Sequence, residues 1–156
     1  MKKISFVLFI FCSCILQSCK NTTDIKPEVK NIELQINLVR FDSIFAEAKP
    51  NDLKSLKEEF GFMFKNSIPD SLWRLKMTDT LQNEIEKEVS ESFSDFSNYE
   101  EKINLFFKHL KYYFPGESIP KIVTLAEYVD YKSKVILNDS LLYISLDNYL
   151  GKDHRF

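Results

Sequence analysis

The chain has 156 residues, of which 44% are hydrophobic and 28% charged, with a formal net charge of -2. This length and composition indicate one globular domain. The content of 3 Gly and 5 Pro beside 14 Phe and 7 Tyr excludes a collagen-like or low-complexity chain. An isoelectric point of about 5.8 provides no basic field for phosphate groups, which argues against a nucleic-acid partner.

Residues 1–18 have the organisation of a bacterial lipoprotein signal peptide. Lys2 and Lys3 supply the positive start, and Ile4–Leu16 is an apolar stretch too short to span a bilayer as a stable helix. Leu16-Gln17-Ser18-Cys19 resembles the bacterial lipobox. It implies cleavage before Cys19, a diacylglycerol on its sulfur and a palmitate-type acyl chain on its new amino group. A plain secretory signal and an uncleaved anchor helix are the alternatives.

The lipid on Cys19 would hold the protein to a membrane, because several acyl chains anchor far more firmly than one. Residues 19–30 are mostly polar, contain Pro27 and read as a tether. No cysteine follows Cys19, so the domain at 31–156 has neither disulfides nor a thiolate metal site. We expect a cell-envelope protein that faces the periplasm from the inner or the outer membrane.

The pattern of apolar residues in 31–156 predicts an α+β fold. Ile32, Leu34, Ile36 and Leu38 alternate with polar residues, which predicts a strand with one buried face that ends or bulges before Phe41. Helical spacing then predicts three helices, which begin near residues 51, 79 and 97. The first should run for about ten to twelve residues, and a short turn or helix should precede the second.

The second predicted helix has a capping-box-like start at Asp79 and Gln82, and Pro115-Gly116 ends the third. β-type runs follow at 122–125, 135–137 and 142–146, and Asn138-Asp139-Ser140 predicts a hairpin between the last two. The predicted order is therefore a strand, two or three amphipathic helices, and a three-stranded antiparallel or mixed β segment.

Four stretches of the chain resemble a known family. They are Arg40-Phe41-Asp42, Tyr112-Tyr113-Phe114-Pro115, Ile119–Thr124 and, as the most specific, Leu146–Asp153. Together with the lipobox they resemble the gliding motility lipoprotein GldB family of Bacteroidetes. The resemblance implies an envelope lipoprotein required for surface gliding and linked to the type IX secretion machinery, with no established enzymatic activity. Family members continue well past Phe156, so the chain would correspond to their N-terminal half.

The family is also distantly similar to predicted zinc peptidases, in which a hairpin like 133–146 leads to a helix with an H-E-x-x-H motif. That motif is absent from the chain, as are the G-x-S-x-G, G-x-G-x-x-G and phosphate-loop motifs. We therefore predict a non-enzymatic protein without a cofactor or metal. A degenerate or truncated peptidase-like domain and a binding module for a small envelope ligand are the alternative hypotheses.

Neither of the 2 histidines suggests a zinc site. His109 is expected on the solvent side of the third helix. His154 lies near Asp147 and Asp153 and could join an oxygen-rich metal site, but no second histidine follows at helical spacing.

Two groups of residues are candidate contacts with motility or secretion proteins. Arg40 and Asp42 interrupt an apolar run at positions i and i+2, on one face of the predicted strand. The simpler interpretation is a local ion pair or an Asp cap. The alternative is that the two side chains form part of a contact surface for a partner or for the rest of the protein. The second group belongs to the C-terminal stretch and contains Asp147, Tyr149, Gly151, Lys152 and Asp153.

Asp followed by Ser or Thr and an apolar residue occurs more often than composition predicts. This sequence resembles the O-glycosylation acceptor motif of Bacteroidetes envelope proteins, although it also suits helix caps and turns. The possible acceptors are Ser43, Ser71, Thr80 and Ser140.

Overall fold

The computed structural model describes residues 25–128 and 130–156, and the chain divides into two compact units. In the first unit, Met1–Ile32, the described residues contain the short helix α2 (Pro27–Lys30). Pro27 begins this helix, where its missing N–H removes no helical hydrogen bond. The predicted signal peptide and Cys19 lie outside the described residues.

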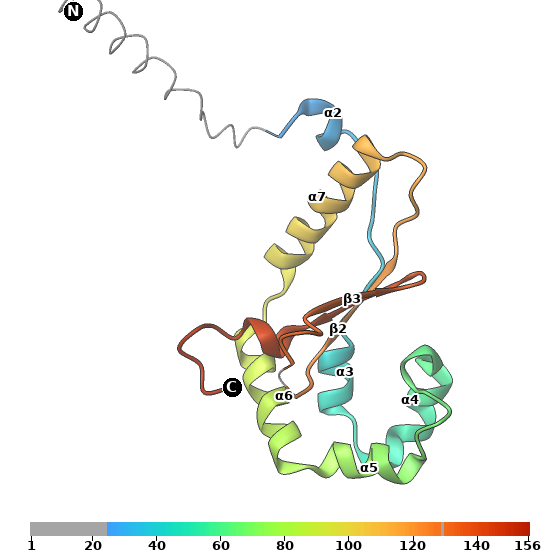
Figure 1. Ribbon diagram of the computed structural model, residues 1–156, viewed down its shortest axis with the longest axis vertical. Coiled ribbons are helices and arrows are strands. Elements are labelled where there is room, and N and C mark those ends of the chain that lie inside the picture. Colours follow the sequence, from blue (N-terminus) through green and yellow to red (C-terminus); the bar gives the residue numbers. More distant parts are fainter. Residues whose placement is uncertain (1–24, 129) are drawn as a thin grey trace, which may run out of the picture. The chain divides into compact units, whose positions relative to one another are not determined.

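The second unit, Glu33–Phe156, is an α+β domain built on a four-stranded mixed sheet (Figure 1). The strands lie in the order β1-β2-β4-β3; β1, β2 and β4 are parallel, and β3 is antiparallel to β4. The strands are β1 (Leu38–Val39), β2 (Lys121–Leu125), β3 (Val135–Asn138) and β4 (Leu141–Ser145). The predicted α+β class is confirmed. Of the antiparallel and mixed arrangements that the sequence allowed, the mixed one is found, with four strands in the sheet and not three.

In the described residues, this unit also contains five α-helices and three 3-10 turns. The helices are α3 (Phe41–Glu47), α4 (Leu53–Glu59), α5 (Asp70–Thr78), α6 (Thr80–Ser92) and α7 (Ser97–Tyr113). The turns are η2 (Pro50–Asp52), η3 (Gly61–Met63) and η4 (Leu146–Tyr149). All helices of this unit lie between β1 and β2 in sequence, which is why β1 and β2 can pair in parallel.

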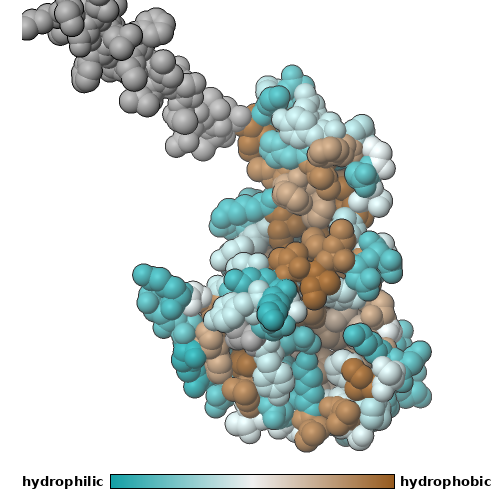
Figure 2. Space-filling model, in the orientation of Figure 1, coloured by the Kyte–Doolittle hydropathy of each residue, from teal (hydrophilic) through white to brown (hydrophobic). Residues whose placement is uncertain are grey.

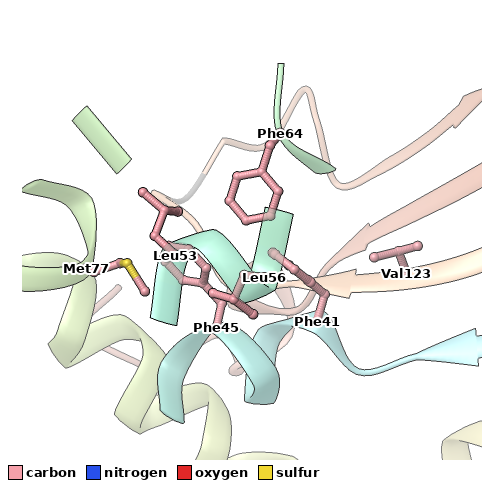
Figure 3. Close-up of a cluster of buried hydrophobic side chains, with 7 residues drawn as sticks. All are labelled: Phe41, Phe45, Leu53, Leu56, Phe64, Met77 and Val123. Carbon is pink, nitrogen blue, oxygen red and sulfur yellow. The ribbon is translucent and has the colours of Figure 1, made fainter. Parts of the chain in front are cut away.

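Alternate residues of the central strands face two different helical layers. Val123 and Tyr143 pack with α3, α4 and α5, in a cluster that includes Phe41, Phe45, Leu53, Leu56, Phe64 and Met77 (Figure 3). Ile122 and Leu142 point the other way and pack with Ile36 and with Phe107 of α7. β2 is therefore buried on both faces, and aromatic edge-to-face contacts such as Phe64–Trp73, with ring centroids 4.8 Å apart, fill the first cluster.

The predicted N-terminal strand is mostly wrong. Only Leu38 and Val39 pair with β2, while the residues before them are extended without a ladder. Ile36 is nevertheless buried against Phe107, so the alternation reports one-sided packing and not sheet pairing. Arg40 is the N-cap residue of α3 and Asp42 lies within α3, so these two residues do not share a strand face.

The predicted helices differ from the observed ones mainly at their ends. The first is shorter than expected, because α4 ends at Glu59 and Phe60 and Phe64 fall outside it. The predicted cap of α6 is confirmed, since Asp79 Oδ1 accepts a hydrogen bond of 2.8 Å from the Gln82 N–H. Trp73 lies in α5, as expected of a short helix before α6.

The predicted hairpin is confirmed for β3 and β4. Asn138 pairs with Leu141, which leaves Asp139 and Ser140 as a two-residue turn. Asp139 has a φ of 51°, a left-handed conformation that Asp tolerates better than most residues and that favours tight hairpins.

Candidate functional site

The parallel strands place several polar side chains at one edge of the sheet. β1, β2 and β4 run in the same direction, so their carboxyl ends meet. Asp42 follows β1, Thr124 lies near the end of β2, and Asp147 follows β4. All three are buried, so this edge holds a polar cluster inside the domain.

Arg40 and Asp42 form a two-bond ion pair within this polar cluster. Arg40 Nε lies 2.9 Å from Asp42 Oδ1, and a terminal nitrogen of Arg40 lies 2.7 Å from Asp42 Oδ2. Asp42 also accepts a hydrogen bond from the Thr124 hydroxyl, and Arg40 donates one of 3.2 Å to the Phe93 carbonyl. The guanidinium stacks 4.3 Å from the ring centroid of Phe96. These contacts tie α3 to β2 and to the end of α6, as the local ion-pair interpretation requires.

Two further carboxyl groups, those of Asp147 and Glu86, are buried in the domain. Asp147 accepts hydrogen bonds from the Glu127 N–H at 3.1 Å and from the Asn148 amide at 3.0 Å. Burial raises the pKa of the Asp147 carboxyl, although the Glu127 N–H opposes the shift. Burial likewise raises the pKa of Glu86, whose Oε1 accepts a hydrogen bond of 2.7 Å from Gln82.

Gln82 and Glu86 were not predicted as part of a site. They lie at the i and i+4 positions of the α6 face that also carries Ile85 and Val89, and all four are buried. Gln82 Nε2 also donates a hydrogen bond of 2.8 Å to the Ala126 carbonyl, which joins α6 to the end of β2. The sequence did contain a signal for this contact. Gln82 and Glu86 are polar residues on the apolar face of an amphipathic helix, and buried polar groups require hydrogen-bond partners.

A small cavity lies beside Asp42. Its volume is about 50 Å³, and its lining includes Phe41, Met63, Trp73, Lys76 and Glu86. That space fits a few water molecules but not a substrate. The ion pair and the hydrogen bonds around it therefore indicate a structural role for this edge of the sheet.

The C-terminal stretch forms a larger, open hollow of about 410 Å³. Four of the predicted contact residues line it, namely Asp147, Tyr149, Gly151 and Lys152, whereas Asp153 is exposed in the same segment. Gly151 has a φ of 115°, which explains why a glycine stands there.

The C-terminal segment is held to α6 by charged side chains. His154 Nε2 lies 3.1 Å from Glu88 Oε2, and Arg155 lies 3.4 Å from Glu84 and 3.5 Å from Glu88. The contact with His154 lowers the pKa of Glu88. Among the described residues, no group of three His, Cys, Asp or Glu side chains is placed to hold a metal ion.

The possible glycosylation acceptors lie at element ends, and they differ in exposure. Ser71 and Thr80 stand in the first turns of α5 and α6, and Ser140 lies in the hairpin turn; all three are exposed. Ser43 is half-buried in α3, 3.4 Å from the Arg40 guanidinium.

Comparison with known proteins decides the family. Residues 22–156 match the family model described as gliding motility protein GldB. The chain belongs to the GldB family. GldB proteins are gliding motility lipoproteins and are not a known enzyme family. The match begins after Cys19, so it stands independently of the lipobox.

No curated protein and no solved structure matches the chain. The distant similarity to zinc peptidases that the GldB resemblance implied therefore finds no support. Among the described residues, no helix combines the length and the apolar character needed to cross a membrane.

Proposed function

We propose that this GldB protein is held to a membrane by lipid on Cys19 and supports gliding motility, and the linked type IX secretion machinery, through protein contacts. It would face the periplasm and act without catalysis. The match to the GldB family over residues 22–156 is the observation that carries the proposal.

The C-terminal segment is the surface that best fits such a contact. It contains Leu146–Asp153, the stretch that resembles the family most specifically, and Tyr149 is 49% exposed beside Lys152 at the open hollow. An exposed tyrosine ring is a common centre for a protein interface, and a lysine beside it suits the polar rim of that interface. The ion pair of Arg155 with Glu84 and the contact of His154 with Glu88 connect this segment to α6.

A complementation experiment tests this contact surface. A gliding host that lacks its own copy would receive the chain with Tyr149→Ala or Lys152→Ala, and Tyr113→Ala and Lys65→Ala would be the controls. Tyr113 is 54% exposed and Lys65 is also exposed, so the controls remove similar surface elsewhere. We expect the first pair to reduce gliding and type IX secretion at unchanged protein abundance. Equal gliding in all four strains would contradict the assignment.

Membrane attachment is tested separately with Cys19→Ser. We expect this variant to lose incorporation of labelled palmitate and to leave the membrane fraction, because the acyl chains would have no thiol to attach to. Retention of the unlabelled variant in the membrane would favour an uncleaved anchor helix instead.

A second candidate function is the binding of a small envelope ligand in the C-terminal hollow. It is favoured by the Asn148 amide oxygen, which is buried and lacks a hydrogen-bond partner within the described residues. Asn148→Ala should then abolish any ligand-induced rise in melting temperature seen with envelope extracts, whereas a variant that keeps the full rise would exclude this site.

A further inference from the structure

β3 forms an edge of the sheet, and its outer side carries no strand among the described residues. The Ser145 N–H donates to the Lys134 carbonyl at 3.0 Å, so the backbone of Lys134 faces β4. Backbone direction alternates along an antiparallel strand, and therefore Val135 and Leu137 point their N–H and C=O groups away from β4. These groups are a template for another strand.

The side chains of this edge are apolar on both faces of the sheet. Val135, Ile136 and Leu137 are 50%, 45% and 64% exposed. Leu137 also lines a groove of about 520 Å³ with Phe106 of α7 and with Phe114, which follows α7. Hydrophobic surface gathers between α7 and the β3–β4 hairpin in Figure 2. An exposed apolar edge of this kind marks an interaction site.

We propose that β3 pairs in antiparallel fashion with β3 of a second copy of this chain, around a two-fold axis through Ile136. In an antiparallel pair, the side chains of two opposite residues lie on the same face of the sheet. A two-fold axis between two strands must therefore pass through a residue, which then lies opposite the same residue of the other copy. With Ile136 on the axis, Val135 of each copy pairs with Leu137 of the other, and all the outward backbone groups of both residues are satisfied.

The charges beside β3 select this arrangement. Lys132 and Lys134 precede the exposed residues and Asp139 follows them. Antiparallel pairing through Ile136 brings the hairpin turn of each copy, with Asp139, beside the start of β3 in the other copy, where the two lysines lie. Parallel pairing would bring like charges together, which is destabilising between neighbouring strands.

An axis through Leu137 fits less well than one through Ile136. It would set Val135 opposite Asp139, whose left-handed φ of 51° belongs to the hairpin turn and not to a strand. With the axis at Ile136, the Ile136 side chains of the two copies meet on one face. Val135 and Leu137 of the second copy extend the apolar surface beside the groove on the other face.

Cysteine cross-linking in the full chain tests this register. Ile136→Cys should form a disulfide-linked dimer on mild oxidation in native membranes, because residues opposite each other at a non-hydrogen-bonded position have Cα atoms about 4.5 Å apart. Leu137→Cys is the matched control. It is at least as exposed, but in this register its two Cα atoms lie about 8 Å apart and cannot be bridged. The unsubstituted chain reports the contribution of Cys12, Cys14 and Cys19.

We expect at least fivefold more linked dimer from Ile136→Cys than from Leu137→Cys. Equal linking by both, preferential linking by Leu137→Cys, or no dimer above the unsubstituted chain would each overturn the proposal. Capture of a different protein by Ile136→Cys would assign the edge to another occupant and would also overturn it.

A second variant tests the backbone pairing itself. Leu137→Pro removes an N–H that points away from β4, so proline is compatible with the β3–β4 ladder at this position. Combined with Ile136→Cys, it should lower the linked fraction severalfold while the melting temperature shows that the domain is folded. Undiminished linking in the folded double variant would overturn the strand-pairing geometry.

Discussion

Arg40 and Asp42 are only two residues apart, yet they hold together three parts of the domain. Their side chains form an ion pair through two hydrogen bonds of 2.9 and 2.7 Å. Asp42 also accepts a hydrogen bond from Thr124 of β2, and Arg40 donates one to the Phe93 carbonyl at the end of α6. The side chain of Asp42 is 1% exposed and that of Arg40 is 22% exposed. A pair buried to this degree is costly to break from one side, because little solvent reaches the remaining charge to replace its partner.

Asp42→Ala should therefore lower the free energy of unfolding by about 3 kcal/mol. Urea denaturation followed through the fluorescence of the single tryptophan, Trp73, measures the change. Glu47→Ala, on the exposed side of the same helix, is the control and should change the free energy by less than about 0.5 kcal/mol. Equal effects from the two substitutions would show that the ion pair has no special structural role.

Glu86→Gln should raise the stability of the domain near pH 7. Burial raises the folded-state pKa of Glu86, so its contribution to stability is fully present below about pH 4.5 and is lost as the pH rises through the raised pKa. Glutamine keeps an oxygen that can accept the bond from Gln82 without a charge. Melting temperatures between pH 4 and 8 should show a gain that grows with pH, on the order of a few degrees at pH 7.

The control for this pH dependence is Glu91→Gln on the exposed face of α6. Its melting temperature should follow that of the unsubstituted protein at every pH. A Glu86→Gln variant that is less stable at pH 7, or that shows a constant difference across the range, would contradict the role assigned to burial.

Gly151→Ala should distort the C-terminal segment and reduce gliding. A Cβ would meet no atom within 4 Å at either Gly151 or Gly116, but only Gly151 has a positive φ, at 115°. A side chain at this φ is strained by about 1 kcal/mol or more. Complementation should show impaired gliding with Gly151→Ala and normal gliding with Gly116→Ala. The same outcome for both would mean that the backbone conformation at Gly151 has no functional importance.

Intact-mass measurement of the protein from its native envelope tests glycosylation. We expect increments of hexose size, lost in part when Ser71, Thr80 or Ser140 is replaced by alanine, because these three acceptors are exposed. Ser43→Ala should have little effect, since Ser43 is half-buried beside Arg40. A mass with no such increments would exclude glycosylation at all four Asp-Ser/Thr motifs.

Features that depend on neighbouring residues could be predicted from the sequence. The cap of α6 by Asp79 and the turn at Asp139 are set by residues within four positions, and both were found as expected. The helix α7 was also predicted because its apolar residues recur at helical spacing, although Phe106 and Phe114 are exposed in the groove and not in the core.

Features that depend on distant residues could not be predicted in the same way. Thr124 lies 82 positions from Asp42, and Gln82 lies 44 positions from the Ala126 carbonyl that it contacts. Nothing in the spacing of a single sequence joins such pairs. The alternation from Ile32 to Leu38 was misleading for a related reason, since one-sided burial produces the same pattern with or without a neighbouring strand.

The gliding speed of single cells, recorded by time-lapse microscopy before and after deletion of the gene, tests the central claim most directly. If this GldB protein supports gliding motility, deletion should stop the cells and a copy of the chain should restore their movement. Cells that lack the protein and still glide at the original speed would contradict the proposed function.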